Sequence, residues 1–163
     1  MSAWLLLIAW VWPLLLVWPA SGVRFRQDWD RAASTPAPRP SPLPWVALGP
    51  VPALAAALLV PVGTELPLPW LFLGTHLALD ATAQVYLAFT ALVWLSAGVY
   101  AAFGERGGPP EAPAAHSGRF DALFLLSMAG NFWLIVGADL FSFYAGFAMM
   151  GIAAYGLVVH DGS

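Results

Sequence analysis

The chain has 163 residues, of which 60% are hydrophobic and 9% are charged, and its mean hydropathy is +0.75. Soluble domains carry roughly 25% charged residues, because a folded surface must be solvated, so this composition excludes an ordinary water-soluble domain. The net charge of −3, with arginine as the only strongly basic residue type, excludes a basic surface for nucleic acid, and the lack of cysteine excludes disulfides and thiol chemistry.

The first predicted element is a membrane helix within residues 1–23, near Ala3–Pro19, because no charged side chain precedes Arg24. A helix needs about 20 mostly apolar residues to cross the hydrocarbon core of a bilayer. A cleaved signal peptide is the alternative interpretation, since Pro19-Ala-Ser-Gly is typical of a cleavage region. We expect the helix to be retained, because no basic residue precedes its apolar core and the apolar stretch is long for a signal peptide.

Residues 24–44 form the first predicted loop, which holds four of the six arginines and a proline-rich stretch, as solvated linkers do. A second membrane helix is predicted at Trp45–Val62, which also contains no charged side chain. Residues 63–80 contain the sequence Leu-Pro-Leu-Pro-Trp, and prolines at alternate positions disfavour a helix. We therefore expect a short extended or hairpin-like loop between the second and third helices.

A third membrane helix is predicted within residues 81–103, and a Gly/Pro-rich loop follows it at residues 104–118. Residues 119–160 carry the fourth and fifth helices, near Arg119–Ala138 and Leu140–His160. The fifth helix is dense in alanine and glycine, which let helix backbones approach closely in a membrane, so we expect protein rather than lipid to cover it. The predicted fold class is an all-α membrane protein with about five transmembrane helices.

The arginines predict the orientation of these helices. All six arginines lie in the first and third connections or, for Arg119, directly at the end of the third, and the second and fourth connections contain no lysine or arginine. Alternate connections lie on the same side of a membrane, and by the positive-inside rule the arginine-rich side is cytoplasmic. We therefore expect a multi-pass protein of a bacterial inner (cytoplasmic) membrane, with its N-terminus outside and its C-terminus inside.

Polar residues within or beside the membrane helices are the candidate functional residues, because burying them in lipid is costly. Asn131 lies in the fourth predicted helix, where it either forms an interhelical hydrogen bond or lines a hydrated path. Asp139 lies between the fourth and fifth helices, where it either caps the next helix or forms the mouth of a proton path. Asp80 at the start of the third helix and His160 at the end of the fifth complete the set.

Catalytic, cofactor and metal sites are not predicted. The histidines, His76, His116 and His160, are far apart, and none has the partner three or four residues away that a helix-borne metal site needs. The predicted helices offer no nucleophile with a base and no pair of acid and base groups. We therefore expect no cofactor and no catalysis by this chain alone.

Three stretches of the C-terminal half resemble the fourth and fifth helices of antiporter-like membrane subunits. They are Gly118-Arg-Phe-Asp-Ala-Leu-Phe-Leu-Leu-Ser-Met-Ala-Gly-Asn, Gly137-Ala-Asp-Leu-Phe-Ser-Phe-Tyr and Met149-Met-Gly-Ile-Ala-Ala-Tyr-Gly-Leu-Val. Upstream, Leu77-Ala-Leu-Asp resembles the Leu-Asp that enters the third helix of that family after a short hairpin. The family occurs in respiratory complex I, Mrp-type cation/proton antiporters, membrane-bound hydrogenases and related inorganic-carbon uptake systems.

The chain departs from this family in two respects. Members carry a membrane-embedded glutamate in the fifth helix that is central to proton movement, and the matching position here is Ala148. Members also have many more helices, including one with a key lysine, whereas this chain resembles only the N-terminal portion of such a bundle. We therefore expect a truncated or split subunit that other chains complete.

The resemblance implies a membrane subunit of a proton-translocating antiporter-like or NADH:quinone oxidoreductase-like complex. In such a complex the chain would contribute scaffold and part of an ion path, and would contact other membrane subunits and the lipid bilayer. The alternative is an accessory or assembly membrane protein without a transport path of its own, which is favoured by the lack of any ionisable side chain buried within the predicted helices.

Overall fold

The computed structural model describes residues 3–31, 45–71, 74–104 and 118–160. This part of the chain is mostly helical, with one two-stranded sheet. The helices are α1 (Trp4–Arg31), α2 (Trp45–Leu48), α3 (Val51–Leu59), α4 (Ala81–Gly104), α5 (Gly118–Val136) and α6 (Leu140–His160), and the strands are β1 (Thr64–Leu68) and β2 (Thr75–Leu79). The mostly helical class predicted from the sequence is confirmed.

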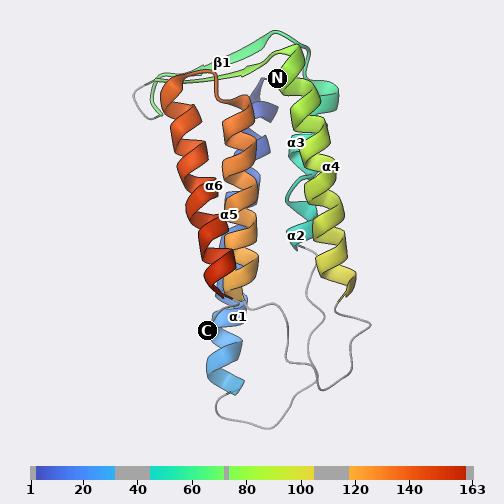
Figure 1. Ribbon diagram of the computed structural model, residues 1–163, viewed down its shortest axis with the longest axis vertical. Helices are drawn as coiled ribbons and strands as arrows, with labels where there is room; N and C mark the ends of the chain where they lie inside the picture. Colours follow the sequence, from blue (N-terminus) through green and yellow to red (C-terminus); the bar gives the residue numbers. More distant parts are fainter. Residues whose placement is uncertain (1–2, 32–44, 72–73, 105–117, 161–163) are drawn as a thin grey trace.

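The long helices lie side by side, and the β1–β2 hairpin crosses one end of the bundle, which we call the hairpin end (Figure 1). Helices α1, α4 and α6 begin at the hairpin end and run away from it, whereas α5 runs toward it (Figure 1). Helix α4 packs against α2 and α3, α6 packs against α5, and α1 contacts both α3 and α5. The expected loops at 24–44 and 104–118 lie mostly outside the described residues.

Helix α1 is longer than predicted, because it continues past the expected loop boundary at Arg24 as far as Arg31. Arginine and glutamine are good helix formers, and residues 24–31 contain neither proline nor glycine, so the sequence offers nothing there that stops a helix. The apolar part of α1 nevertheless ends at Pro19. The first charge thus marks the end of the apolar segment and not the end of the helix.

The predicted second helix, Trp45–Val62, is not continuous. The chain leaves helical structure after Leu48 and resumes it at Val51, so that α2 and α3 flank Gly49-Pro50. Proline lacks a backbone N–H and its ring clashes with the preceding turn, which explains the break.

Side chains from neighbouring helices bond to carbonyl groups near the ends of α2 and α3. Nε1 of Trp12 in α1 donates to the carbonyl oxygen of Leu48 at 3.2 Å. Nε2 of Gln84 in α4 donates to the carbonyl oxygen of Ala57 at 2.8 Å. Carbonyls at helix ends lack partners within their own helix, so these two bonds stabilise the interrupted segment and join it to both neighbours.

The hairpin covers the end of the bundle with one face. In the antiparallel register Leu66 lies opposite Leu77, and alternate residues of each strand are buried. Gly63 and Gly74 precede the two strands with φ values of 84° and 97°, a left-handed conformation that glycine adopts without strain. The segment in which an extended or hairpin-like loop was expected therefore forms two regular strands.

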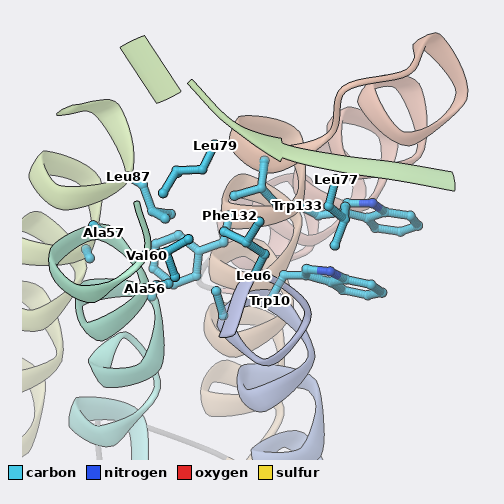
Figure 2. Close-up of a cluster of buried hydrophobic side chains, with 14 of the residues drawn as sticks. Leu6, Trp10, Ala56, Ala57, Val60, Leu77, Leu79, Leu87, Phe132 and Trp133 are labelled. Atoms are coloured by element: carbon cyan, nitrogen blue, oxygen red, sulfur yellow. The ribbon is translucent and has the colours of Figure 1, made fainter. Parts of the chain in front are cut away.

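The core lies directly beneath the hairpin, where α1, α3, α4, α5 and β2 meet (Figure 2). Leu77 and Leu79 of β2 are fully buried above Phe132 of α5 (Figure 2). Beside them the indole rings of Trp10 and Trp133 stack with their centroids 4.5 Å apart. Helix α1 thus contributes to the core.

Helices α5 and α6 pack closely because glycines face each other across their interface. A Cβ atom added to Gly130 would lie 2.6 Å from the backbone nitrogen of Met150 and 2.9 Å from the carbonyl oxygen of Gly146. A Cβ atom added to Gly146 would lie 2.7 Å from the backbone nitrogen of Leu134. These glycines permit the backbone approach that small residues allow between helices.

Two described helices are long and apolar enough to cross a membrane, and the apolar stretches are Ala81–Tyr100 and Leu140–Val159. Within the 18-residue apolar window of each stretch, 17% of the residues are buried. Five spanning helices were expected, but the other three apolar stretches, Trp4–Pro19, Val46–Leu59 and Phe120–Val136, are shorter. The expectation that protein covers the fifth predicted helix holds for one face of α6 only.

Candidate functional site

Asp139 lies between α5 and α6 at the hairpin end, and both oxygens of its carboxylate accept hydrogen bonds. Its Oδ1 accepts a hydrogen bond from the backbone N–H of Ser142 at 2.8 Å, so that Asp139 caps the N-terminus of α6. Its Oδ2 accepts hydrogen bonds from the Ser142 hydroxyl and from the backbone N–H of His76 at 2.8 Å. One carboxylate therefore joins α6 to the hairpin.

Backbone contacts hold the same junction together. The N–H of Ala138 donates to the carbonyl oxygen of His76 at 2.8 Å, and Leu77 forms an antiparallel bridge with Gly137. The segment between α5 and α6 thus pairs with β2. This pairing places the carboxylate of Asp139 beside the N–H of His76.

The environment of Asp139 favours the ionised carboxylate. Partial burial works against ionisation, but hydrogen bonds from the Ser142 hydroxyl and from the backbone amides of His76, Ser142 and Phe141 outweigh it. The pKa of the Asp139 carboxyl is therefore lowered below its ordinary value of 3.8. A carboxylate that stays ionised at neutral pH suits a helix cap better than a group that takes up and releases protons.

Asp80 plays the matching role at the start of α4. Its Oδ1 accepts a hydrogen bond from the backbone N–H of Ala83 at 2.6 Å, and its carbonyl oxygen accepts one from the N–H of Gln84 at 2.9 Å. Asp80 directly follows β2, to which Asp139 is also bonded. The structure thus brings both candidate carboxylates to the hairpin end, where each caps a helix.

Asn131 and Ala148 are not part of this cluster. Asn131 is half-buried in α5, and its side chain makes no hydrogen bond to another described residue, so the expected interhelical bond is not found there. Ala148 is exposed on the side of α6 that faces away from α5. The described helices therefore do not enclose a path that joins Asp139, Asn131 and Ala148.

His160 is the last residue of α6, and its side chain lies outside the described part of the chain. Among the described residues there is no group of three or more histidine, aspartate and glutamate side chains that could hold a metal ion. Comparison of the chain with protein-family models, curated protein sequences and solved structures finds no match.

Sequence reasoning missed three residues of the hairpin end that the structure makes important. Ser142 has a buried side chain and bonds to Asp139, and its position three residues after an aspartate is the signal of a capped helix start. Trp10 and Trp133 stack in the core, although they are far apart in the sequence and no local pattern links them.

Proposed function

We propose that the chain is a membrane-embedded scaffold subunit of a proton-translocating complex of the antiporter-like type, and that the outer face of α6 contacts a partner helix. The observation that carries the proposal is the one-sided packing of α6. This helix packs against α5 and β2, whereas the opposite face, with Ala148 near its centre, is exposed. In the family that the sequence resembles, the matching position bears the functional glutamate.

The exposed face of α6 has the spacing of a helix-packing seam. Its central residues follow one another at intervals of three and four, the interval of a heptad seam, and we call them the α6 seam: Phe141, Tyr144, Ala148, Gly151, Tyr155 and Val158. Small residues at its middle allow close approach of a partner helix. A Cβ atom added to Gly151 meets no atom within 4 Å, so the seam is open at this point.

A scaffold role is favoured over proton conduction by the position of the carboxylates. Glu65, Asp80 and Asp139 lie at the hairpin end, and Asp121 lies in the first turn of α5 at the other end. Among the described residues, the apolar stretches Ala81–Tyr100 and Leu140–Val159 contain no acidic or basic side chain. Proton transfer through a membrane needs such groups, so the partner must supply them.

Site-specific crosslinking in native membranes tests the α6 contact. A photoreactive residue at Ala148 should crosslink to one integral membrane protein with acidic or basic residues inside its helices, whereas the same residue at Val93 on the exposed face of α4 should not. Gly151→Leu should lower co-purification of that protein by roughly tenfold, as loss of close helix packing predicts. Ala154→Leu is the matched control, because Ala154 is exposed on α6 outside the seam. Equal co-purification of the two variants would contradict the proposal.

The proposed orientation places the hairpin end outside the cytoplasm. Cysteines introduced at Ser34 and Ser117 should react with a membrane-impermeant thiol reagent only from the cytoplasmic side, because arginine-rich connections stay there. A cysteine at Glu65, which is exposed on the hairpin, should react only from the opposite side. Labelling of Ser34→Cys from outside would reverse the orientation.

An accessory or assembly role without a transport path is the second candidate. It is favoured by the helix-capping role of both Asp80 and Asp139. Asp139→Asn keeps an oxygen that can cap α6 but removes the charge, and Ser142→Ala keeps the charge but removes one bond to it. If Asp139→Asn alone loses ion-driven activity while the complex assembles normally, the result favours a scaffold subunit that also lines part of an ion path. Impaired assembly in both variants, with normal activity in the complexes that form, favours the assembly role.

A further inference from the structure

We infer that the outer face of α4 contacts the acyl chains of a lipid bilayer, so that the chain lies at the lipid-facing margin of its complex. The inference rests on the proposed membrane subunit and extends it, because it assigns an occupant to a second face of the chain. The residues that carry it are exposed on one side of α4, and we call them the α4 stripe: Val85, Phe89, Leu92, Val93, Ser96 and Val99.

The α4 stripe and the α6 seam lie on different sides of the molecule. Helices α4 and α6 lie on opposite sides of the bundle, with α5 between them (Figure 1). Helix α4 packs against α2, α3 and α5, and these contacts leave the stripe uncovered. A partner helix that packs on the α6 seam therefore cannot also cover the α4 stripe, which needs an occupant of its own.

The members of the α4 stripe differ in size from the residues at the middle of the α6 seam. Except for Ser96 they are large hydrophobic side chains, and these are between 40% and 68% exposed. The small residues of α4 lie on its inner side instead: Ala91 is fully buried, and a Cβ atom added to Gly98 would lie 3.0 Å from the Cα atom of Ala47. Small residues allow close helix packing in a membrane, so α4 uses its packing surface within the chain and presents a surface suited to lipid outward.

The α4 stripe is complementary to hydrocarbon in charge and polarity. None of its members is charged. The Ser96 hydroxyl donates to the carbonyl oxygen of Val93 at 2.8 Å, so it needs no partner outside the helix. The exposed Tyr86 and Tyr100 beside the stripe lie within two turns of the ends of α4, where a tyrosine hydroxyl can reach headgroups or water. The stripe thus offers no charge and no unsatisfied side-chain donor that a protein partner would have to match.

The length of α4 also fits a bilayer. Its apolar stretch Ala81–Tyr100 has 20 residues. At 1.5 Å per residue this stretch is about 30 Å long, which matches the thickness of the hydrocarbon core. Asp80, directly before it, then lies at headgroup depth, and Val93 lies near the middle of the bilayer. Acyl chains can therefore cover the α4 stripe over its whole length.

Photolabelling of the full chain in native membranes tests the inference. A diazirine side chain is placed at Val93 or at Ala148, and after illumination the mass of the purified chain shows whether a phospholipid, a protein or water has reacted with it. We expect phospholipid adducts at Val93, roughly tenfold more abundant than at Ala148, where the proposed partner helix excludes lipid. Mainly protein adducts at Val93 would overturn the inference, and so would mainly water adducts.

The label at Ala148 separates this inference from the proposed function. Phospholipid adducts at both positions would count against the partner of α6, while the contact of the α4 stripe with lipid would stand. Protein adducts at both positions would leave the partner of α6 in place and would overturn the lipid contact.

A matched pair of substitutions tests the same contact without a label. Val93→Trp enlarges a side chain of the α4 stripe, and Gly151→Trp enlarges one of the α6 seam. Acyl chains adapt to any side-chain shape, whereas a packed helix does not, so Val93→Trp should leave co-purification of the membrane partner within about twofold of the native level and Gly151→Trp should lower it roughly tenfold. An equal loss in both variants would mean that protein packs on α4 as well, which would overturn the inference.

Discussion

The indole rings of Trp10 and Trp133 stack with their centroids 4.5 Å apart and their planes 11° from parallel. The first ring belongs to α1 and the second to α5, and each side chain is 5% exposed. The N–H of the Trp10 ring makes no hydrogen bond with a described residue, so packing rather than hydrogen bonding ties this ring to the core. Leu77 of the hairpin lies next to the pair (Figure 2).

Trp10→Ala should destabilise the fold strongly, because it removes a large ring from a packed core. Losses of about 3–5 kcal/mol are typical for such substitutions. Trp10→Phe should keep most of this stability, since no hydrogen bond of the Trp10 ring to a described residue is lost. Unfolding by denaturant in detergent micelles, followed by circular dichroism, measures the effect. Leu15→Ala, at a position of the same helix that is 61% exposed, is the control and should change stability by less than about 0.5 kcal/mol.

The same packing predicts that the mature protein keeps α1. Cleavage after residue 20 would remove Leu6 and Trp10 from the core and uncover the buried Phe132. Exposing that much apolar surface at the centre of a small bundle is unfavourable. The intact mass of the purified chain should therefore include residues 2–23. A mass that corresponds to a chain starting near Gly22 would show that α1 is a cleaved leader.

Gly130→Ala should weaken the contact between α5 and α6, because its Cβ atom would lie 2.6 Å from a backbone nitrogen of Met150. Overpacking of this kind costs about 1–3 kcal/mol. Gly151→Ala is the matched control, since nothing lies within 4 Å of its Cβ atom and alanine favours a helix by roughly 1 kcal/mol over glycine. Opposite shifts in the thermal midpoint are expected for the two variants. A stabilising Gly130→Ala would contradict the close packing.

Sequence reasoning succeeded where strong local signals mark an element. Asp80 and Asp139 precede long apolar stretches, and α4 and α6 begin one residue after them. It failed where opposing signals compete: the apolar pattern predicts one helix across Gly49-Pro50, but the missing N–H of proline breaks it. The charge of Arg24 also predicts the start of a loop, but the helix continues past it because arginine and glutamine, which follow, are good helix formers.

The faces of the helices could not be predicted either. Helices α4 and α6 are apolar all round, and a helix without a polar side has no periodicity that shows which side packs. The outward position of Ala148 and the pairing of Gly130 with Gly146 therefore emerge only from the three-dimensional arrangement. The contact of Asp139 with His76 depends in the same way on the hairpin folding back over α6.

Acid should weaken the junction that Asp139 forms. Since its pKa is lowered in the folded chain, the stability that it contributes is fully present above its ordinary value of 3.8 and is lost as the pH falls from there through the folded pKa. Asp139→Asn should lower the thermal midpoint at pH 6 and should no longer differ from the native chain near pH 2. Ser142→Ala removes a bond that lowers the pKa of the folded chain, so its loss of stability in acid should be smaller and should be complete at a higher pH than in the native chain. A constant difference between the native chain and Asp139→Asn at every pH would contradict the assignment.

The last prediction concerns proton conduction by the chain alone. Transfer of protons across a bilayer requires groups that take up and release them, and the apolar stretches of α4 and α6 hold none with acidic or basic side chains. Ala148→Glu should not create conduction by itself, because this position faces away from α5 and the new carboxyl would point out of the bundle. Vesicles that contain a pH-sensitive dye should report the same flux for the native chain, for Ala148→Glu and for the uncharged control Ala148→Gln as for empty vesicles. Flux through the native chain above that of empty vesicles would mean that Asp139 exchanges protons across the membrane despite its cap, which would replace the scaffold role with a transport role.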